Sequence, residues 1–347
     1  MIPPATPQGS NLSFLSLISV GHFHPPTIID NEFLTSLEIG VDANWVIERV
    51  GIRQRRTVLP LDYIRQTKNT DPRASAEAAM FSDGEMGSKA ACHALSRAGL
   101  NAKDIGMVIA GGCSPHLSIP AQACLTAAEL QIEAPCFDVN SACSSFAAQL
   151  HVLNGMRPET LPDYILLVNV ENNTRTVDYN DRRTAVLWGD CSSAAIVSPR
   201  IPGRARIEAS VLHSDPSGWK HVMIPAGGHF QQDGQAVQAF AIRKTIATLE
   251  ELAEKLPSDT QSSFIGHQAN ALMLEAVCRR TETPPERHFF NVDLFGNCGA
   301  AGAPSVLSQN WDQIGKGYLS IAVVGSGLTW GGVLFNFSSD SSKEHAA

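Results

Sequence analysis

The sequence has no run of the roughly 20 apolar residues that a membrane-spanning helix requires. The apolar stretch 12–20 near the N-terminus is interrupted by Ser13, Ser16 and Ser19, and no basic segment precedes it. These features predict a first β-strand and not a signal peptide. We therefore expect a cytoplasmic protein with no membrane partner.

Long basic runs are also absent. The 347 residues include 26 lysines and arginines against 34 aspartates and glutamates, which gives a formal net charge of −8. An acidic chain without a basic cluster does not attract a polyanion over a broad surface. Nucleic acid is therefore excluded as an expected partner.

The cysteine pattern gives no sign of a metal site or of a disulfide framework. Eight cysteines are present, and none of them forms a Cys-x-x-Cys pair. Spacing of this kind fits reduced thiols in a cytoplasm, with no bound metal. With 44% hydrophobic residues, the chain can bury a large core in one large or two ordinary domains.

Apolar strand-like runs alternate with amphipathic helical segments, and their order occurs twice along the chain. Such alternation predicts an α/β fold built from two repeated units, 1–200 and 201–347, with largely parallel sheets covered on both faces. The first copy contains a helix from 82 to 98, strand 107–111, helix 121–130, a strand leading to Cys143, helix 146–153, and strands 164–170 and 194–197; the second contains helix 237–256, strand 264–266, helix 271–277, strand 289–293, a glycine-rich turn entering a helix, and strands 318–324 and 331–337.

Cys143 stands at a strand-to-helix corner, where unpaired helix N–H groups favour a thiolate. His267 and Asn297 follow strands in the second copy. Reactive residues gather at strand ends in such sheets, so we expect these three side chains to meet. The alternatives are a buried packing cysteine, a core histidine and a helix-capping asparagine.

Together the three residues suit carbon–carbon bond formation between thioesters. The Cys143 thiolate can accept an acyl group, with its own N–H and that of Ser326 in the turn 325–327 as oxyanion donors. His267 and Asn297 can donate to a second thioester whose malonyl-type group loses CO₂ and leaves an enolate. An amide donates without titrating, which favours decarboxylative condensation over hydrolysis.

Several motifs in this order resemble those of the β-ketoacyl-acyl carrier protein synthase III family of the thiolase superfamily, over residues 12–337. They are residues 45–53, the corner 136–146, Trp188-Gly189-Asp190, Gly266-His267-Gln268-Ala269-Asn270, Gly296-Asn297 and Gly325-Ser326-Gly327-Leu328-Thr329-Trp330-Gly331.

The resemblance implies a five-layered α-β-α-β-α fold and a homodimer. It assigns Cys143, His267 and Asn297 to catalysis, and it implies coenzyme A or phosphopantetheine thioesters as substrates and no further cofactor. It also places Trp45, Arg49 and Arg182 against coenzyme A, although the residues alone favour a solvated charged face there. Ile119 corresponds to the position that a partner subunit projects into the acyl pocket, and Phe146 to the wall of that pocket.

Some positions depart from the family pattern. Leu272 and Ala239 stand where basic residues usually face the acyl carrier protein, and the pair after the cysteine is Ser144-Ser145 instead of Ala-Gly. Ile119 is smaller than the aromatic residue often found there, so an acyl chain longer than acetyl could fit. Basic residues that could replace the carrier-protein contacts are Arg243, Lys244, Arg279 and Arg280.

The sequence leaves function open between alternatives. The first is a condensing enzyme of fatty-acid initiation or of specialised, polyketide-like metabolism. The second is an acyltransferase that passes the acyl group to an alcohol or amine, and the third is a silent subunit of a heterodimer. Residues assigned to packing or given no role are Cys113, Cys124, Cys298, His22, His24 and His116.

Overall fold

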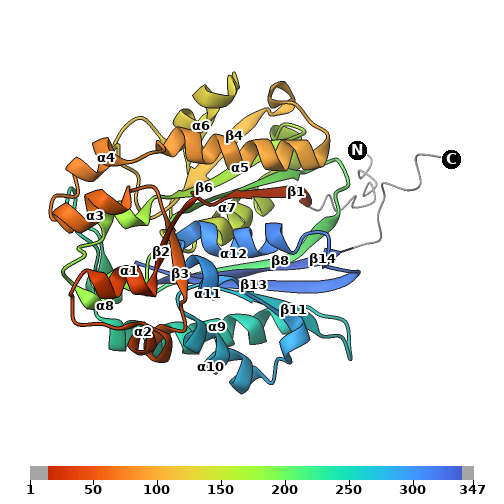
Figure 1. Cartoon of the computed structure of the whole chain (residues 1–347). Helices are drawn as coiled ribbons and strands as arrows, with labels where there is room; N and C mark the ends of the chain where they lie inside the picture. The colour runs from red at the N-terminus through yellow and green to blue at the C-terminus, as the bar shows by residue number, and fades with distance from the viewer. Residues whose placement is uncertain (1–14, 338–347) are drawn as a thin grey trace, which may run out of the picture.

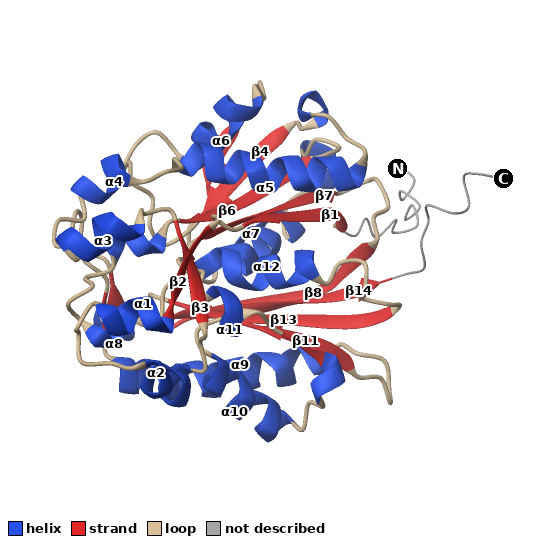
Figure 2. Ribbon diagram, in the orientation of Figure 1, coloured by secondary structure: helices blue, strands red, loops and turns tan. Residues whose placement is uncertain are grey.

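The computed structural model describes residues 15–337, and residues 12–14 of the predicted first strand lie outside this range. Helices and strands form five layers, with a sheet on each side of a central helical layer (Figures 1 and 2). The five-layered α/β fold is thereby confirmed. The helices of the layers are α5 (Asp83–Ala98) and α6 (Gln122–Leu130) on one outer face, α7 (Ser145–Asn154) and α12 (Gly299–Gln309) in the centre, and α9 (Gly234–Ala253) and α10 (Ala271–Thr281) on the other outer face.

The strands form two groups of five with matching order. These groups run β5-β4-β6-β7-β1 and β12-β11-β13-β14-β8, and they are joined where β1 pairs with β8 at two positions. The matching strand order of the two groups confirms the repeat predicted from the sequence. The strands are β1 (Ser16–Phe23), β4 (Met107–Gly111), β5 (Cys136–Asp138), β6 (Ile165–Glu171), β7 (Cys191–Ser198), β8 (Ala205–Ser214), β11 (Ser262–Gly266), β12 (His288–Phe289), β13 (Gly317–Gly325) and β14 (Thr329–Phe337).

The expectation of largely parallel sheets is wrong for half of each group. Strand β4 pairs in parallel with β5 and β6, and β11 does so with β12 and β13. However, β7 is antiparallel to β6 and β1, and β14 is antiparallel to β13 and β8. No crossover helix separates β13 from β14, and a short turn can join only antiparallel strands.

The predicted strand 289–293 is also wrong beyond its first residue. The structure has the short strand β12 followed by helix α11 (Val292–Phe295). The backbone N–H groups of Asn291 and Val292 donate to the side chain of Gln268 at 3.0 and 3.2 Å instead of to a neighbouring strand. A buried glutamine therefore turns the chain out of the sheet and toward α12.

Segments 27–78, 173–185 and 216–232 surround one end of the layers. The first contains two antiparallel strands with two short helices between them, and it continues as two further short helices. The elements are β2 (Thr27–Asp30), α1 (Asn31–Ser36), α2 (Ala43–Val50), β3 (Gln54–Thr57), α3 (Leu61–Thr67), α4 (Ala74–Ala78), η3 (Asn173–Thr176), α8 (Arg182–Ala185), η4 (Pro216–His221), β9 (Val222–Met223) and β10 (Gln231–Gln232); three single 3₁₀ turns, η1 (Ala102–Asp104), η2 (Pro158–Thr160) and η5 (Pro285–Arg287), lie elsewhere.

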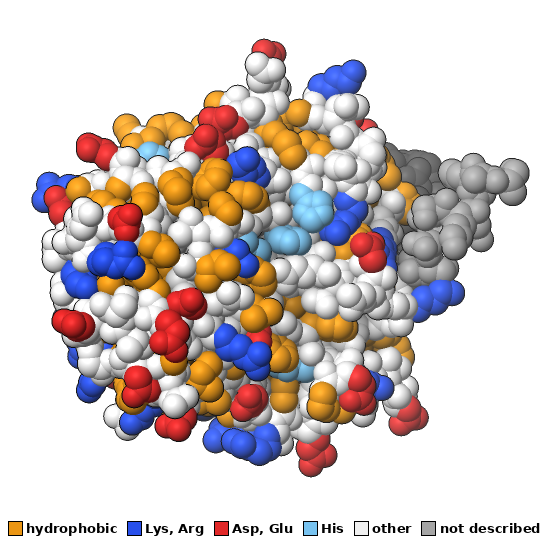
Figure 3. Space-filling model, viewed as in Figure 1, with side chains coloured by type: hydrophobic (Ala, Val, Ile, Leu, Met, Phe, Trp, Pro, Cys, Tyr) orange, Lys and Arg blue, Asp and Glu red, His pale blue; other side chains and the backbone are white. Residues whose placement is uncertain are grey.

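The two halves of the chain share their hydrophobic core. One buried cluster contains Val168 of the first half and Leu274 of the second, and another fills the space between the sheets around α7 and α12. The proposed division at residue 200 falls in the loop between β7 and β8 and stays a prediction. Within residues 15–337, no helix is long and apolar enough to cross a membrane. Acidic and basic side chains are interspersed on the face shown in Figure 3.

Candidate active site

Cys143 is held in a tight turn between β5 and α7. Backbone N–H groups of Ser144 and Ser145 donate to the carbonyls of Ser141 and Ala142, both at 3.0 Å. The Ser145 hydroxyl accepts the N–H of Ser141 at 2.9 Å, and Ala142 has a φ of 47°. The turn is therefore fixed by hydrogen bonds on both sides of the cysteine, whose side chain remains 8% exposed.

His267 and Asn297 both come from the second half of the chain, at the ends of two different elements. His267 directly follows β11, and its N–H donates to the Ala322 carbonyl at 2.9 Å. Asn297 follows α11, and its N–H donates to the Leu187 carbonyl at 2.8 Å. The side-chain oxygen of Asn297 accepts the N–H of Gly299 at 3.0 Å, so its amide NH₂ is left to donate elsewhere.

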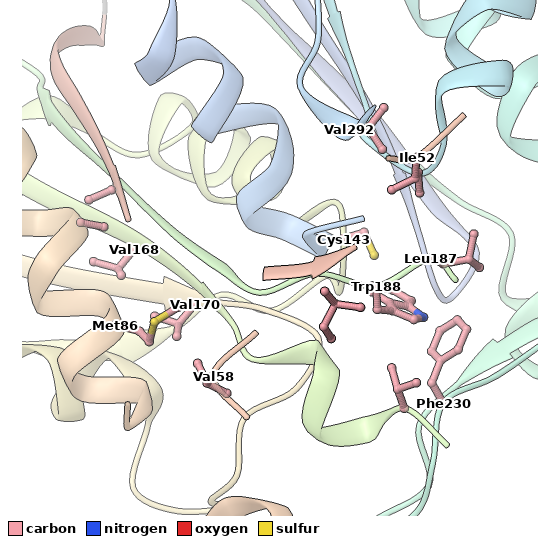
Figure 4. Close-up of a cluster of buried hydrophobic side chains, with 14 of the residues drawn as sticks. Ile52, Val58, Met86, Cys143, Val168, Val170, Leu187, Trp188, Phe230 and Val292 are labelled. Atoms are coloured by element: carbon pink, nitrogen blue, oxygen red, sulfur yellow. The ribbon is translucent and has the colours of Figure 1, made fainter. Parts of the chain in front are cut away.

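One cavity of about 380 Å³ is lined by Cys143, His267 and Asn297 together. The spatial expectation from the sequence, that the two repeats bring these residues to one place, holds in the structure. Figure 4 shows Cys143 at the rim of a buried cluster, near Trp188. Apolar side chains lining the same cavity include Leu187, Trp188, Val222, Phe230, Val324 and Leu328.

The surroundings of Cys143 favour its thiolate. A hydrogen bond from the Cys113 thiol and the nearby His267 imidazole lower the pKa of Cys143 to about 5, against the opposing effect of burial. The Cys113 and Cys143 sulfurs lie 3.3 Å apart. The same sulfur contact, together with burial, raises the pKa of Cys113 well above its usual value, so the pair holds one thiolate and one thiol.

The turn after β13 lies directly against the Cys143 turn. A Cβ atom added at Gly325 would lie 2.9 Å from the backbone nitrogen of Ser144, so only glycine allows this approach. Ser326 lines the cavity, and its hydroxyl donates to the Val222 carbonyl at 2.5 Å. Both backbone segments that carry the predicted oxyanion donors, at Cys143 and Ser326, therefore border the cavity.

Comparisons with known proteins agree with this geometry. Residues 137–216 match the family model described as 3-oxoacyl-[acyl-carrier-protein (ACP)] synthase III, and residues 253–337 match its C-terminal model. A β-ketoacyl-[acyl-carrier-protein] synthase III from Syntrophomonas wolfei is 31% identical over 349 residues, which cover 94% of this chain and 98% of that protein. The chain belongs to the 3-oxoacyl-[acyl-carrier-protein] synthase III family.

Solved structures of family members share the fold. The 3-oxoacyl-[acyl-carrier-protein] synthase III of Aquifex aeolicus superposes with a TM-score of 0.82 at 25% identity, covering 93% of this chain and all (100%) of that one. The enzyme from Pseudomonas aeruginosa gives a TM-score of 0.81 at 26% identity, with 94% and 99% covered. This family member is accordingly an acyltransferase of the ketosynthase type.

The mouth of the cavity in this family member carries an indole between guanidinium groups. The guanidinium carbons of Arg49 and Arg182 lie 5.8 and 5.5 Å from the centre of the Trp45 ring. Trp45 and Arg49 line the cavity, whereas Arg182 lies beside them and donates to the Gly40 carbonyl at 2.9 Å. Arg183, which the sequence motifs did not mark, lines the cavity in its place.

Two residues predicted for the acyl pocket lie elsewhere in this chain. Phe146 is 1% exposed, belongs to the core between the sheets and is not among the residues that line this cavity, so its assignment to the pocket wall stays a prediction. Ile119 lies on the loop before α6 and is 83% exposed, so its role needs a second chain and stays a prediction.

Cys113, which the sequence assigns to packing, also contacts the sulfur of the predicted nucleophile. Its position in the sequence could have indicated this contact, because Cys113 comes just after β4. The neighbouring strands in the sheet, β5 and β6, also end near the site. Glu171, buried at the end of β6, joins the Cys113 loop to the site. It accepts the N–H of Cys113 at 2.9 Å and the N–H of Ala300 at 2.7 Å.

Proposed function

We propose that this enzyme loads an acyl group onto Cys143 from a coenzyme A or carrier-protein thioester and condenses it with a malonyl-type thioester, with loss of CO₂. The observation that carries the proposal is the single cavity shared by Cys143, His267 and Asn297. A nucleophile alone would serve hydrolysis or simple acyl transfer. Two further hydrogen-bonding side chains facing the same space suit the stabilisation of an enolate oxygen.

In the first half-reaction, the Cys143 thiolate attacks the carbonyl carbon of the acyl thioester. Charge develops on the carbonyl oxygen, where the N–H groups of Cys143 and Ser326 are the proposed donors. Collapse of this intermediate breaks the original carbon–sulfur bond and releases the donor thiolate. Since one thioester replaces another, the step requires little net free energy.

In the second half-reaction, a malonyl-type thioester loses CO₂, and the electrons of the broken carbon–carbon bond form an enolate. His267 and Asn297 donate hydrogen bonds to the enolate oxygen. The enolate carbon attacks the acyl-Cys143 carbonyl and expels the Cys143 thiolate, which regenerates the enzyme. The depressed pKa of Cys143 also makes its thiolate a good leaving group.

Coenzyme A is the proposed acyl carrier at the cavity mouth, where Trp45 can stack on the adenine and arginines can meet phosphate. Relatives are named β-ketoacyl-[acyl-carrier-protein] synthase III, which supports a carrier protein as the second thioester donor. Of the basic residues proposed to dock it, Lys244 lies with its ammonium 3.9 Å from the Trp330 ring centre.

The test combines a mass measurement with a gas measurement. Incubation with a panel of acyl-coenzyme A thioesters should add the acyl mass to the wild-type protein but not to Cys143→Ala. Adding malonyl-coenzyme A or a malonyl-carrier protein to the acylated enzyme should release CO₂ and form a β-ketoacyl product. Acylation without CO₂ release for any malonyl donor, together with transfer to an alcohol or amine, would establish the alternative acyltransferase. Absence of any adduct would leave the silent-subunit alternative.

A further inference from the structure

We infer that Cys113 and Cys143 form an oxidative modification site, in which peroxide converts the two thiols into an intramolecular disulfide that reversibly closes the active site. The inference begins with their sulfurs, which are 3.3 Å apart in the reduced protein. A disulfide bond is about 2.05 Å long, so closing it requires an approach on the order of 1 Å. The two residues lie on adjacent turns, after β4 and after β5, and β4 and β5 are paired strands.

The two thiols have different chemical states, as a nucleophilic and a resolving cysteine require. Cys143 is the thiolate of the pair and lines the cavity, so a small oxidant can reach it. Cys113 keeps its proton and, among the described residues, does not line the cavity. Oxidation therefore begins at Cys143, and the partly exposed Cys113 supplies the second sulfur.

The reaction balances with hydrogen peroxide as the oxidant. The Cys143 thiolate attacks one peroxide oxygen, the O–O bond breaks, hydroxide leaves, and a sulfenic acid forms. The Cys113 sulfur then attacks the Cys143 sulfur, the S–O bond breaks, and the hydroxyl leaves as water with the thiol proton. Two thiols and one peroxide thus give one disulfide and two waters. A dithiol reductant returns the two electrons and two protons.

Glu171 holds Cys113 where this reaction needs it. Its carboxyl accepts the Cys113 N–H through both oxygens, at 2.9 and 3.0 Å, and is fully buried. The backbone of Cys113 is therefore anchored to β6 while its side chain faces Cys143.

Another cysteine pair in the chain offers an internal comparison. Cys191 and Cys298 also have sulfurs within 4.8 Å of each other and of a His24 nitrogen. They are only 0% and 1% exposed, and neither lines the cavity among the described residues. Because peroxide cannot easily reach these two buried sulfurs, we expect the Cys191–Cys298 pair to oxidise slowly. Peroxide should therefore react first at the Cys113–Cys143 pair.

The experiment treats the reduced full-length protein with hydrogen peroxide, blocks the remaining thiols with iodoacetamide, and maps the products by mass spectrometry. Before alkylation, the intact protein should lose about 2 Da, and dithiothreitol should reverse this loss. Chymotryptic peptides should then show Cys113 joined to Cys143. Cleavage sites that separate Cys113, Cys124, Cys136 and Cys143 into different peptides are Leu117, Leu125, Leu130, Phe137 and Phe146.

Cys113→Ser is the matched variant, because it removes the resolving sulfur and leaves Cys143. Its Cys143 should advance to the sulfinic acid, with a gain of about 32 Da that dithiothreitol does not reverse. Cys92→Ser, at an exposed cysteine, should oxidise as the wild type does. Acylating Cys143 first should protect both thiols.

The inference is overturned if the wild-type protein pairs Cys191 with Cys298, or if Cys143 stays reduced or becomes sulfinic acid while Cys113 is alkylated. It rests on the proposed function only for the nucleophilic character of Cys143. Mapping needs no acyl donor, so the two can fail separately. A protein that condenses thioesters but forms no Cys113–Cys143 bond removes the inference alone, and a protein that forms the bond but does not condense removes the proposed function alone.

Discussion

Asn297 presents its side chain in one orientation, because its oxygen is engaged by the Gly299 N–H and its NH₂ group is free to face substrate. Asn297→Asp keeps an oxygen for Gly299 but replaces the donor with a second acceptor, which carries negative charge. We expect the rate of condensation to fall on the order of 10²-fold, the scale for loss of one donor to a developing oxyanion. Acylation of Cys143 should persist, because Asn297 serves the second half-reaction.

The measurement compares acyl adduct formation by intact mass with CO₂ release from a malonyl donor, for the wild type and Asn297→Asp. Asn291→Asp is a control at another buried asparagine, whose NH₂ donates to Ser305 and Gln309 outside the cavity. A condensation rate equal to that of the wild type in Asn297→Asp would remove Asn297 from the mechanism.

The individual residues show where prediction from sequence succeeds and where it stops. Cys143 and His267 are predictable because each follows a strand, and the ends of these strands converge. Asn297 is predictable from its motif, although it follows helix α11 and not a strand. The burial of Phe146 in the core between the sheets could not be predicted, because the direction of a helical side chain depends on how the helix packs. The Cys113 contact depends on side-chain placement at a scale of a few ångströms, which no motif encodes.

The turn between β13 and β14 places Gly325 against the nucleophile turn of the other repeat. A Cβ atom at residue 325 would lie 2.9 Å from the Ser144 nitrogen and 3.0 Å from the Ser141 carbonyl oxygen, so one of the two turns must shift. Gly325→Ala should therefore slow acylation of Cys143 by roughly 10-fold or more, since misplacement by about 1 Å can cost 10²-fold.

Gly315→Ala is the matched control, because a Cβ atom there would have no heavy atom within 4 Å. Acylation rates by mass spectrometry and thermal unfolding of both variants separate a displaced turn from a destabilised protein. If Gly325→Ala acylates Cys143 at the wild-type rate, acylation does not depend on the close approach of the two turns. The Ser326 N–H would then lose its proposed role as an oxyanion donor.

Helix α2 supplies the indole at the cavity mouth. If Trp45 stacks on the adenine of coenzyme A, Trp45→Ala should raise KM for acyl-coenzyme A about 10-fold, which corresponds to about 1.4 kcal/mol. KM for an acyl-N-acetylcysteamine thioester, which lacks the nucleotide, should change little. An equal increase for both substrates would instead indicate that Trp45 supports the fold of the mouth.

Among the elements, the repeated order is readable because fully buried strands such as β6 and β7 appear as continuous apolar or small-residue runs. The early end of the predicted strand 289–293 could not be read in this way. The side chain of Gln268, which is distant in the sequence, accepts the backbone N–H groups of residues 291 and 292 there. Antiparallel pairing of β7 likewise follows from tertiary arrangement, since β6 and β7 are separated by a long excursion.

Across the whole molecule, β5 is the edge strand of its group and carries exposed apolar side chains. Phe137 on β5 is 37% exposed, and Ile119, on the loop before α6, is 83% exposed. Unprotected edges of this kind favour pairing with another chain. We predict a homodimer formed along β5, which would bring Ile119 to the partner's cavity.

Light scattering after size-exclusion chromatography should give twice the 37.2 kDa chain mass. Phe137→Lys should shift the protein toward monomer, whereas Phe290→Lys, just beyond the opposite edge strand β12 and 46% exposed, should not. A monomeric wild type, or a dimer that only Phe290→Lys disrupts, would place the interface elsewhere.

Glu171 connects the two halves, because its carboxyl accepts N–H groups from Cys113 in the first half and from Ala300 in the second. These hydrogen bonds favour the carboxylate, but burial outweighs them and raises the pKa of Glu171 from 4.5 to about 8. Between these values the folded protein retains a proton that the unfolded chain has lost. The stabilisation is complete below the unfolded pKa and is lost as pH rises through about 8.

Thermal unfolding should therefore show that Tm declines more steeply from pH 5 to pH 8 in the wild type than in Glu171→Gln, which cannot titrate at this position. Glu133→Gln, at an exposed glutamate, should retain the wild-type decline. If Glu171→Gln and the wild type lose stability in parallel, the carboxylate must be accommodated without cost, and the hydrogen bonds from its two N–H donors, Cys113 and Ala300, must outweigh its burial. Because those donors come from both repeats, that result would make Glu171 an ionic link between the halves instead of a buried neutral acid.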